Sequence, residues 1–434
     1  MRNFSRCSDS PIIALIGLGY VGLPLARLFS TKYKVVGFDL NENRIKELSQ
    51  GVDSTKEVET LLLKKAIDSG RLTFSSNSDD LSSCNVYIVA VPTPVDENNR
   101  PNLFPLLHAS EIVSKVLSEN DIVIYESTVY PGVTEEECVP ILEKGSGLLF
   151  NEDFFVGYSP ERINPGDKEH SVEKIVKVTS GSTEETADFV DNLYNSVLLN
   201  GTHKAPSIKV AEAAKIIENT QRDVNIAFMN ELAKIFNAMG IDTHDVIKAA
   251  SSKWNFIKMS PGLVGGHCIS VDPYYLIQKA QVYGVFPRIM STARRLNDGM
   301  GDYVANQVIK CMNKKGILVK DACILILGFT FKENCPDIRN TKVIDIYNTL
   351  TEYTNRIVVY DPWANRGKVK KEYGIDLFTD SYEEIKGKFD VVILSVAHKE
   401  FLSIDIKEFL KDTKVGVIYD VKGVLPKEYV DYRL

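Results

Sequence analysis

Short, wholly apolar runs alternate with helical segments over the first 130 residues, and this alternation limits the folds that the chain can adopt. The expected strands are 12–17, 35–40, 85–94 and 122–128, and the expected helices are 22–33, 41–51 and 106–117. A strand that is apolar throughout is buried on both faces, which is typical of a parallel sheet covered by helices. The sequence therefore predicts a doubly wound α/β domain.

The same order of elements returns near the C-terminus. The segments CILILGFTF, RIVVYDP, FDVVILSVA and GVIYDVKG, which begin at residues 323, 356, 389 and 416, repeat the early strands in sequence order. We therefore predict a second Rossmann-like domain. Its first turn reads Gly328-Phe-Thr-Phe-Lys332 in place of a glycine fingerprint, so we do not expect it to hold a second dinucleotide.

The middle of the chain is helical. Residues 208–239 form one helical pattern without Pro or Gly until Gly240, and further helical segments follow, including 287–310. A helix of this length is too long for a crossover, which suggests a spine that also packs a subunit interface. The predicted domains are 1–205, 206–310 and 311–434: two Rossmann-like domains joined by a central helical domain.

Composition narrows the class of protein further. Lys and Arg number 51 against 58 Asp and Glu, a net charge of −7 without long single-sign runs, which argues against a nucleic-acid partner. The polar start and the absence of an apolar run near 18 residues argue against export and membrane insertion, so we expect a cytoplasmic protein. Seven scattered cysteines without a Cys-x-x-Cys motif predict neither disulfides nor a metal site.

A glycine fingerprint follows the first expected strand and opens a helix. It consists of Gly17, Leu18, Gly19, Tyr20, Val21 and Gly22. Such glycines allow a tight turn, close approach of the backbone to a pyrophosphate, and packing of helix on strand. Asp39 ends the next strand and is placed to accept hydrogen bonds from a ribose, which favours NAD over NADP. Arg44 lies near enough to leave NADP open.

Two later loops are expected to line the same crevice. Val91-Pro-Thr93-Pro94 follows the third strand and Glu126-Ser-Thr128 follows the fourth. Their hydroxyls would lie where a cofactor binds, because ligands of such sheets sit at the carboxyl ends of the strands. Turn residues and helix caps are an equally good interpretation of the same positions.

The long helix carries Lys215 and Asn219, four residues apart and therefore on one face. A lysine and an amide on a common face can stabilise an oxyanion or take a proton from an alcohol. The alternative is a lysine on a solvated side of the helix.

The segment Pro261-Gly-Leu-Val-Gly265-Gly266-His267-Cys268 delivers a cysteine on a glycine-rich loop, and Asp272 follows four residues later. A helix start near Cys268 would lower the pKa of its thiol and make it a nucleophile. Asp272 is placed to orient water or a base. A buried, inert cysteine is the alternative, while a metal pair with His267 lacks further ligands nearby.

A set of motifs occurs in order along nearly the entire chain. They are GLGYVGLPLA, VPTP, EST, YSPERINPG, the Lys215–Asn219 pair, GLVGGHCISVDPYYL, FK at 331–332 and DIRN at 337–340. This set resembles the UDP-sugar and GDP-mannose 6-dehydrogenase family. The stretch KWNF, followed by the cysteine loop, looks most like the UDP-N-acetylglucosamine 6-dehydrogenases of bacterial polysaccharide synthesis.

The resemblance implies an NAD-binding domain, a central helical domain that forms a homodimer, and a domain that binds a UDP-sugar. It also implies a four-electron oxidation of a sugar C6 alcohol to a carboxylate, with two NAD used in succession and no metal. Cys268 matches the family nucleophile, which would hold the sugar as a thiohemiacetal and then as a thioester.

The resemblance also implies roles for the other site residues. Lys215 and Asn219 would stabilise oxyanions, Asp272 and Thr128 would help to position water, and Glu161 would be an acid/base in thioester hydrolysis. Lys215, acting through water, is the preferred acceptor of the first alcohol proton.

Four further positions match residues of the family that bind ligands. Lys332, Gly265 and Arg162 would contact the nucleotide sugar, and Arg339 would lie near the cofactor or the domain junction. A cation such as Lys332 supplies the local positive charge that an anionic ligand of an acidic chain requires.

The sequence leaves the sugar open. Glucose-specific relatives carry an acid where this chain has Asn164-Pro165-Gly166, and neither Lys253 nor Lys258 clearly matches their basic residue upstream of the cysteine loop. UDP-N-acetylglucosamine is the best prediction, with UDP-N-acetylmannosamine, UDP-N-acetylgalactosamine and UDP-glucose as alternatives. A two-electron hydroxyacid dehydrogenase and an NAD-sensing binding protein fit less well, because neither needs the cysteine loop.

Overall fold

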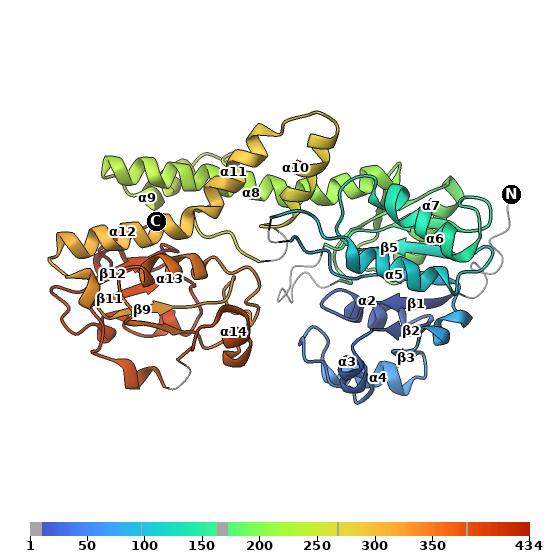
Figure 1. The fold of residues 1–434 in the computed structure, drawn as a ribbon, viewed down its shortest axis with the longest axis horizontal. Coiled ribbons are helices and arrows are strands. Elements are labelled where there is room, and N and C mark those ends of the chain that lie inside the picture. Colours follow the sequence, from blue (N-terminus) through green and yellow to red (C-terminus); the bar gives the residue numbers. More distant parts are fainter. Residues whose placement is uncertain (1–10, 97, 163–171, 267–268, 379–380) are drawn as a thin grey trace. The chain divides into compact units, whose positions relative to one another are not determined.

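The computed structural model describes residues 11–96, 98–162, 172–266, 269–378 and 381–434 (Figure 1). The chain forms two compact units. The first contains the residues up to Glu218 together with Tyr274–Gly284, and the second contains Asn219–Pro273 and Val285–Leu434.

The first unit is built on an eight-stranded sheet in the order β3-β2-β1-β4-β5-β6-β7-β8. The strands are β1 (Ile12–Ile16), β2 (Lys34–Phe38), β3 (Leu72–Ser75), β4 (Val86–Val89), β5 (Ile122–Tyr125), β6 (Phe155–Tyr158), β7 (Lys177–Gly181) and β8 (Thr202–Lys204). The six strands from β3 to β6 run parallel in the dinucleotide-binding order 3-2-1-4-5-6, so the predicted doubly wound fold is confirmed. The strand order reverses between β1 and β4, which is where such sheets bind ligands.

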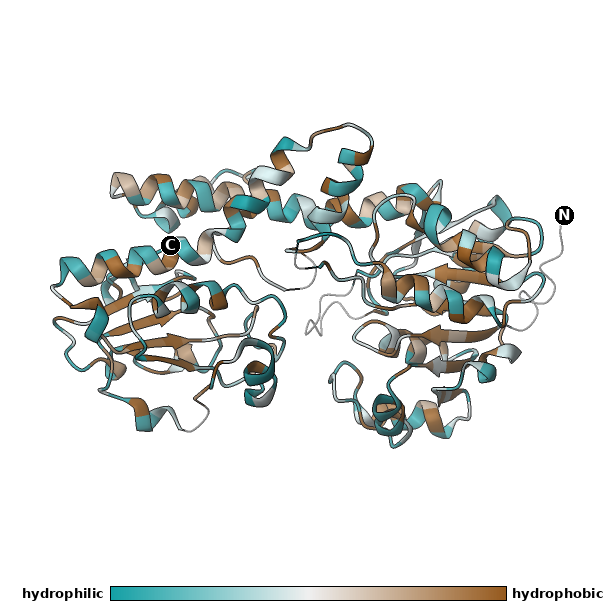
Figure 2. Cartoon of the chain, in the orientation of Figure 1, coloured by the Kyte–Doolittle hydropathy of each residue, from teal (hydrophilic) through white to brown (hydrophobic). Residues whose placement is uncertain are grey.

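The strands β1, β4, β5 and β6 are apolar and buried almost throughout, because helices cover both faces of this sheet (Figure 2). The helices are α2 (Gly22–Phe29), α3 (Glu42–Ser49), α4 (Thr60–Asp68), α5 (Phe104–Ser114), α6 (Val139–Ser146) and α7 (Glu184–Asn195). Apolar side chains of α5 and α6 form one core with the sheet, and those of α2, α4 and α7 form the other.

Strand β7 interrupts the parallel pattern. It runs antiparallel to β6, with Gly157 opposite Gly181 and Tyr158 opposite Ser180. The sequence prediction did not contain β3, β6, β7 or β8. These strands are short or carry polar residues, as Lys177 at the start of β7 shows, so no long apolar run marks them.

The central helices are α8 (Ile208–Met239), α9 (Thr243–Ala250), α10 (Asp272–Val282), α11 (Arg288–Asp298) and α12 (Met300–Lys314). Helix α8 has the predicted bounds and ends where Gly240 adopts a φ of +70°, a conformation that favours glycine. The predicted helical run 287–310 is two helices, because it breaks at Gly299.

Apolar side chains of the central helices contribute to the cores of both units. Ile208 and Ala211 of α8 pack into the first unit, whereas Ala233 of α8 and Met300 of α12 pack into the second. The boundary between the two compact units therefore falls within α8, while the predicted domain boundaries at 205/206 and 310/311 stay a prediction.

The second unit contains a five-stranded parallel sheet in the order β10-β9-β11-β12-β13. Its strands are β9 (Ile324–Leu327), β10 (Ile357–Tyr360), β11 (Val391–Leu394), β12 (Val417–Asp420) and β13 (Tyr432–Arg433), and its own helices are α13 (Val343–Thr351) and α14 (Arg366–Tyr373). The order 2-1-3-4-5 is a doubly wound one, so the predicted second Rossmann-like domain is confirmed.

None of the helices in the described parts of the chain is both long and apolar enough to cross a membrane. Even α8, with 32 residues, carries charged side chains from Lys209 to Lys234.

Candidate active site

The three fingerprint glycines occupy positions with three different constraints. Gly17 has a φ of +92°, and a Cβ there would lie 2.8 Å from the carbonyl oxygen of Ala90. A Cβ on Gly22 would overlap the carbonyl group of Gly17, whereas a Cβ on Gly19 would meet no atom within 4 Å. The turn therefore has the tight bend, the helix packing and the open approach that a pyrophosphate requires.

Asp39 braces this turn from the end of β2. Its Oδ2 atom accepts a hydrogen bond from the backbone amide of Leu18 at 2.9 Å, and its Oδ1 atom accepts one from Asn41 at 2.9 Å. The carboxylate also lines a cavity of about 250 Å³ at the carboxyl ends of β1, β2 and β4. This is the position predicted for a carboxylate that accepts hydrogen bonds from a ribose.

The same cavity has a largely apolar wall that suits an adenine ring. Phe104 and His108 of α5 stack in parallel with their ring centres 5.8 Å apart, and both line it together with Pro92 and Leu40. Sequence reasoning missed these residues, because an aromatic residue and a histidine at the start of a helix form no recognisable motif. The residues present fit NAD, which would supply the hydride acceptor.

Arg44 does not face the cavity as a free cation. Its Nε atom donates to the carbonyl oxygen of Leu18 at 3.0 Å, and its Nη2 atom lies 2.8 Å from Oδ1 of Asp53. The residue is buried, so its guanidinium would have to leave Asp53 to reach a 2′-phosphate. Arg44 therefore supports the glycine turn from behind, and its contact with a cofactor stays a prediction.

The loops after β4 and β5 are tied to each other. The Thr93 hydroxyl donates to the carbonyl oxygen of Thr128 at 2.7 Å, and the Ser127 hydroxyl donates to that of Val91 at 2.6 Å. The hydroxyl of Tyr275 in α10 donates to the carbonyl oxygen of Thr93 at 2.9 Å. The Thr93 hydroxyl thus holds the loop, and a direct contact of Thr93 or Thr128 with a ligand stays a prediction.

Glu161 lies beside a buried cation that the sequence analysis missed. Nζ of Lys177 is 2.5 Å from Oε2 of Glu126 and 3.5 Å from Oε2 of Glu161. Burial raises the pKa of Glu126 to about 7, and Glu161 adds to the shift while Lys177 opposes it. A lysine that opens an otherwise uncharged strand, KVTSG, was the available signal. The neighbouring Arg162 pairs with Glu218 at 2.6 Å.

Lys215 and Asn219 are both buried on α8, with 7% and 5% of their surfaces exposed. A lysine on a solvated side of the helix is therefore excluded. The Asn219 amide donates to Oδ2 of Asp272, which is also buried, at 2.5 Å. The structure thus brings together two of the predicted catalytic residues, Asn219 and Asp272, from the spine and from the start of α10.

Cys268 and His267 lie outside the described residues, as does Asn164-Pro165-Gly166, but the segment before the cysteine is held on both sides. Asn230 of α8 donates to the carbonyl oxygen of Gly262 at 3.0 Å and accepts from its amide at 2.8 Å. The Asn340 amide donates to the carbonyl oxygen of Gly266 at 3.1 Å.

The cysteines that the structure describes are buried or partly buried, and three of them have a raised thiol pKa, unlike a cysteine nucleophile. Burial raises the pKa of the Cys84 thiol to about 11 and those of Cys138 and Cys311 to about 12. Cys335 is also buried, and Cys323 is partly buried. A thiol with such a raised pKa carries almost no thiolate near neutral pH. Within the described ranges, no group of three His, Cys, Asp or Glu side chains is arranged to hold a metal ion.

A small cavity next to Gly265 in the second unit is lined by two lysines, each paired with a carboxylate: Lys422 with Glu333 and Lys342 with Asp345. Lys342 and Lys422 line it together with Phe331 and Glu333. The sequence analysis missed Lys342 and Lys422, which lie apart from the Phe-Lys motif. Lys332 accepts a bond from the Thr330 hydroxyl through its carbonyl oxygen at 2.9 Å, and its predicted contact with the sugar nucleotide is not tested. Arg339 forms a two-pronged pair with Asp337, and its ligand contact also stays a prediction.

Asp361 occupies, at the end of β10, the place that Asp39 has at the end of β2. Oδ2 of Asp361 accepts from the amides of Phe329 and Thr330 at 2.6 and 3.0 Å, and Oδ1 accepts from those of Trp363 and Ala364. The carboxylate is almost fully buried and has no capacity left for a ribose. This supports the prediction that the second Rossmann-like turn does not hold a dinucleotide.

Models of three protein-family domains match the chain in order. They are the NAD binding domain (residues 12–198), the central domain (209–299) and the UDP binding domain (325–427) of the UDP-glucose/GDP-mannose dehydrogenase family.

Individual relatives match over almost the entire length. A UDP-N-acetyl-D-glucosamine 6-dehydrogenase of Pseudomonas aeruginosa is 59% identical over 424 residues, which cover 97% of this chain and 99% of the relative. A protein of the same name from Salmonella typhi is 54% identical over 430 residues, which cover 98% and 99%. The structure of a UDP-D-ManNAc dehydrogenase from Pyrococcus horikoshii has a TM-score of 0.88 at 30% identity and covers 97% of this chain and 98% of that one.

Proposed function

The chain belongs to the UDP-glucose/GDP-mannose dehydrogenase family, and from this premise we propose that it oxidises the C6 hydroxyl of UDP-N-acetylglucosamine to the uronic acid. The observation that carries the choice of sugar is the 59% identity, over nearly the whole chain, with a protein named for this activity. The enzyme is an NAD-dependent nucleotide-sugar dehydrogenase. We expect it to act in the cytoplasm, in the synthesis of a surface polysaccharide.

The proposed reaction removes four electrons in two steps. The first hydride leaves C6 of the alcohol while the hydroxyl proton passes through water to Lys215, and the resulting aldehyde has no hydride to give until a nucleophile adds to it. The Cys268 thiolate forms that C–S bond, and the thiohemiacetal loses the second hydride to become a thioester. Water then adds to the acyl carbon, the C–S bond breaks, and the carboxylate leaves with the thiolate restored. NAD, held at the glycine turn beside Asp39, would supply the hydride acceptor for each step.

The polar residues of the site have separate tasks in this scheme. Lys215 and Asn219 stabilise the oxyanions that form at C6, and Asp272, bonded to Asn219, fixes the direction of that amide. Thr128 helps to position water, and Glu161 takes the proton of the water that attacks the thioester.

Counting NADH against sugar tests the proposal. The enzyme is mixed with UDP-N-acetylglucosamine, UDP-N-acetylgalactosamine, UDP-N-acetylmannosamine and UDP-glucose in turn, and NADH and uronic acid are measured. We expect UDP-N-acetylglucosamine to have the highest kcat/KM, with two NADH per uronic acid, and Cys268→Ala to form no acid. One NADH per sugar with a stable carbonyl product would refute the four-electron reaction.

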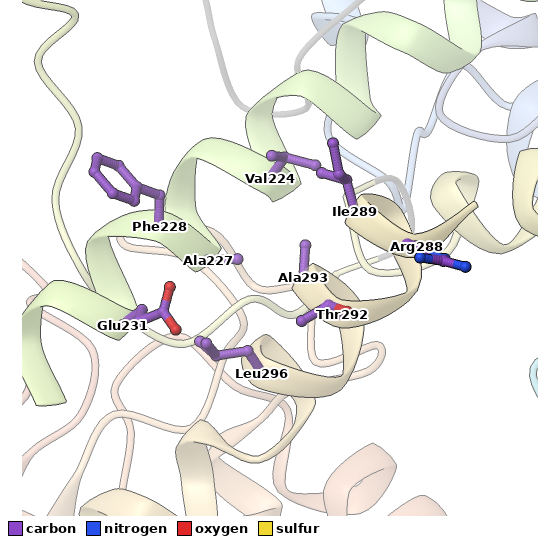
Figure 3. A pocket seen from close by; sticks show the side chains of 9 residues that line it. All are labelled: Val224, Ala227, Phe228, Glu231, Arg288, Ile289, Thr292, Ala293 and Leu296. Carbon is purple, nitrogen blue, oxygen red and sulfur yellow. The ribbon is translucent and has the colours of Figure 1, made fainter. Parts of the chain in front are cut away.

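We also propose that two copies of the chain associate through the central helices. Helices α8 and α11 line a groove of about 340 Å³ that contains Val224, Phe228, Ile289 and Leu296 (Figure 3). Phe228 and Ile289 are 53% and 74% exposed, and Phe286 just before α11 is 67% exposed. Contiguous exposed apolar side chains of this kind are typical of a subunit interface, and a second copy presents the same surface.

The molar mass in solution tests the dimer. We expect light scattering to give twice the chain mass for the wild type and the mass of a single chain for Phe228→Glu. Leu318→Glu is the matched control, because Leu318 is 59% exposed but lies outside the groove, and it should stay dimeric. A Phe228→Glu variant with the mass of the wild type would contradict this interface.

A further inference from the structure

A lysine is enclosed between two carboxylates at the carboxyl edge of the first sheet. Glu126 follows β5, Glu161 follows β6, and Lys177 begins β7. Strand β7 is antiparallel to β6 with Tyr158 opposite Ser180, so continuing this register by three residues brings Glu161 opposite Lys177. The fold itself therefore places the cation beside the proposed acid/base residue.

The two carboxylates bind the lysine unequally. The distance from Nζ of Lys177 is 2.5 Å to Oε2 of Glu126 but 3.5 Å to Oε2 of Glu161. The side chains of Lys177 and Glu126 are 0% exposed, whereas that of Glu161 is 9% exposed. The Tyr194 hydroxyl donates to Oε1 of Glu126, and its ring centre lies 5.3 Å from Nζ of Lys177. Glu126 is thus the fixed anchor, and Glu161 is the carboxylate nearest to solvent.

Stability alone does not explain this cluster. Burying one ammonium and two carboxylates removes their hydration, and well-packed apolar side chains of similar volume are often as stable as a buried ion pair. Charged groups kept in such a place are candidates for a functional role, above all at the edge of a doubly wound sheet where ligands bind.

We propose that Lys177 is a positioning residue, which aligns the Glu161 carboxylate to take a proton from water, while Glu126 and Tyr194 hold Lys177 in place. This inference rests on the role proposed for Glu161 in thioester hydrolysis. The proton moves from the attacking water to Glu161, the hydroxide oxygen bonds to the acyl carbon, and the C–S bond breaks.

The titratable groups around the Glu161 carboxylate come from several elements. Lys177 on β7 and Glu126 after β5 face it directly, and Tyr194 on α7 faces it from behind Glu126. Arg162, the next residue in the chain, turns its guanidinium to Glu218 of α8. Among the described residues, Lys177 is the cation within 4 Å of both carboxylates, and substitutions at Lys177 and Glu126 have opposite electrostatic effects on Glu161.

The pH profile of uronic acid formation from UDP-N-acetylglucosamine and NAD tests the inference. Lys177→Met leaves two buried carboxylates without a cation, so the pair keeps a proton to higher pH. We expect the acid limb of kcat to move up by about one pH unit and kcat at pH 7 to fall about ten- to a hundredfold. Glu126→Gln frees Lys177 for Glu161 alone, so the same limb should move to lower pH.

Two further variants serve as controls. Lys177→Arg keeps the charge and should keep the position of the acid limb. Lys204→Met removes an exposed lysine of the adjacent strand β8, which pairs with Asp188 on the surface, and should leave the whole profile unchanged. If the cluster only stabilises the fold, the variants should change the melting temperature, and the acid limb should not move in opposite directions in Lys177→Met and Glu126→Gln.

Opposite shifts in Lys177→Met and Glu126→Gln support the proposal, and equal or absent shifts overturn it. If Lys177→Met does not fold, Glu126→Gln decides, because an unmoved acid limb in that variant overturns the proposal by itself. A wild-type profile for Glu161→Gln also overturns it, yet leaves the proposed dehydrogenase activity intact. Absence of NADH formation by the wild type with every UDP-sugar overturns the proposed function instead.

Discussion

The segment before the cysteine loop depends on one amide of the spine helix, and this dependence can be measured. Asn230 of α8 is 0% exposed and takes part in three hydrogen bonds, two with the backbone of Gly262 and one from its Nδ2 atom to Oδ1 of Asn297 at 2.8 Å. Asn230→Ala removes all three and leaves the Gly262 amide buried without this acceptor.

The expected loss follows from the count of bonds. Three hydrogen bonds at about 1 kcal/mol each, plus the cost of the stranded amide, give about 3–5 kcal/mol. Asn237→Ala is the matched control, because Asn237 lies seven residues later on α8 and donates one bond, at 2.9 Å, to the partly buried Tyr303. The gain in helix propensity from Asn to Ala is the same at both sites and cancels in the comparison.

Intrinsic fluorescence in urea measures this difference, because both tryptophans, Trp254 and Trp363, belong to the second unit. We expect Asn230→Ala to lower the free energy of unfolding of that unit by about 3 kcal/mol more than Asn237→Ala does. A difference between the two variants below about 0.5 kcal/mol would show that Asn230 does not anchor the segment, since it is less than the net value of one hydrogen bond.

Three other substitutions give independent tests. Asp39→Asn should weaken NADH binding about tenfold or more, because it removes the charge from the acceptor at the glycine turn, and unchanged affinity in a fluorescence titration would contradict this. Burial raises the pKa of Glu212 to about 7 from 4.5, so the folded protein binds this proton more tightly, and the contribution of Glu212 to stability is greater at pH 5.5 than at pH 8. In Glu212→Gln that pH dependence of the melting temperature should shrink. Arg294→Met strands the buried Asp223 and should cost about 3–5 kcal/mol in urea unfolding, whereas the double variant with Asp223→Leu should recover most of it.

The elements that were predicted correctly have a strong and local signal. The strands β1, β4, β5, β9 and β11 are apolar along their length, and α8 has a continuous helical pattern that ends at a glycine. The break at Gly299 and the antiparallel strand β7 depend on tertiary packing, which overrides local patterns. For the same reason the sequence did not indicate that the two compact units divide α8 between them.

The candidate site shows the same limit. The glycine turn, Asp39, and the Asn219–Asp272 contact follow from motifs whose residues are close in sequence or match a family. In the Lys177 cluster, Lys177 lies 16 positions after Glu161 and 51 positions after Glu126. Sequence motifs do not predict that these three residues meet, because their contact depends on the register of β6 against β7. Arg44 was predicted to lie near the cofactor because it follows Asp39 closely in the sequence. Its pairing with Asp53 is seen only in the folded structure.

The pairing of Arg44 with Asp53 also restricts how this enzyme can change its coenzyme during evolution. Replacing Asp39 would remove the carboxylate that disfavours a 2′-phosphate. It would not make Arg44 available to that phosphate, because the guanidinium of Arg44 is bonded to Asp53 and to the carbonyl oxygen of Leu18. A switch to NADP therefore requires a new basic residue at the rim as well as the loss of Asp39.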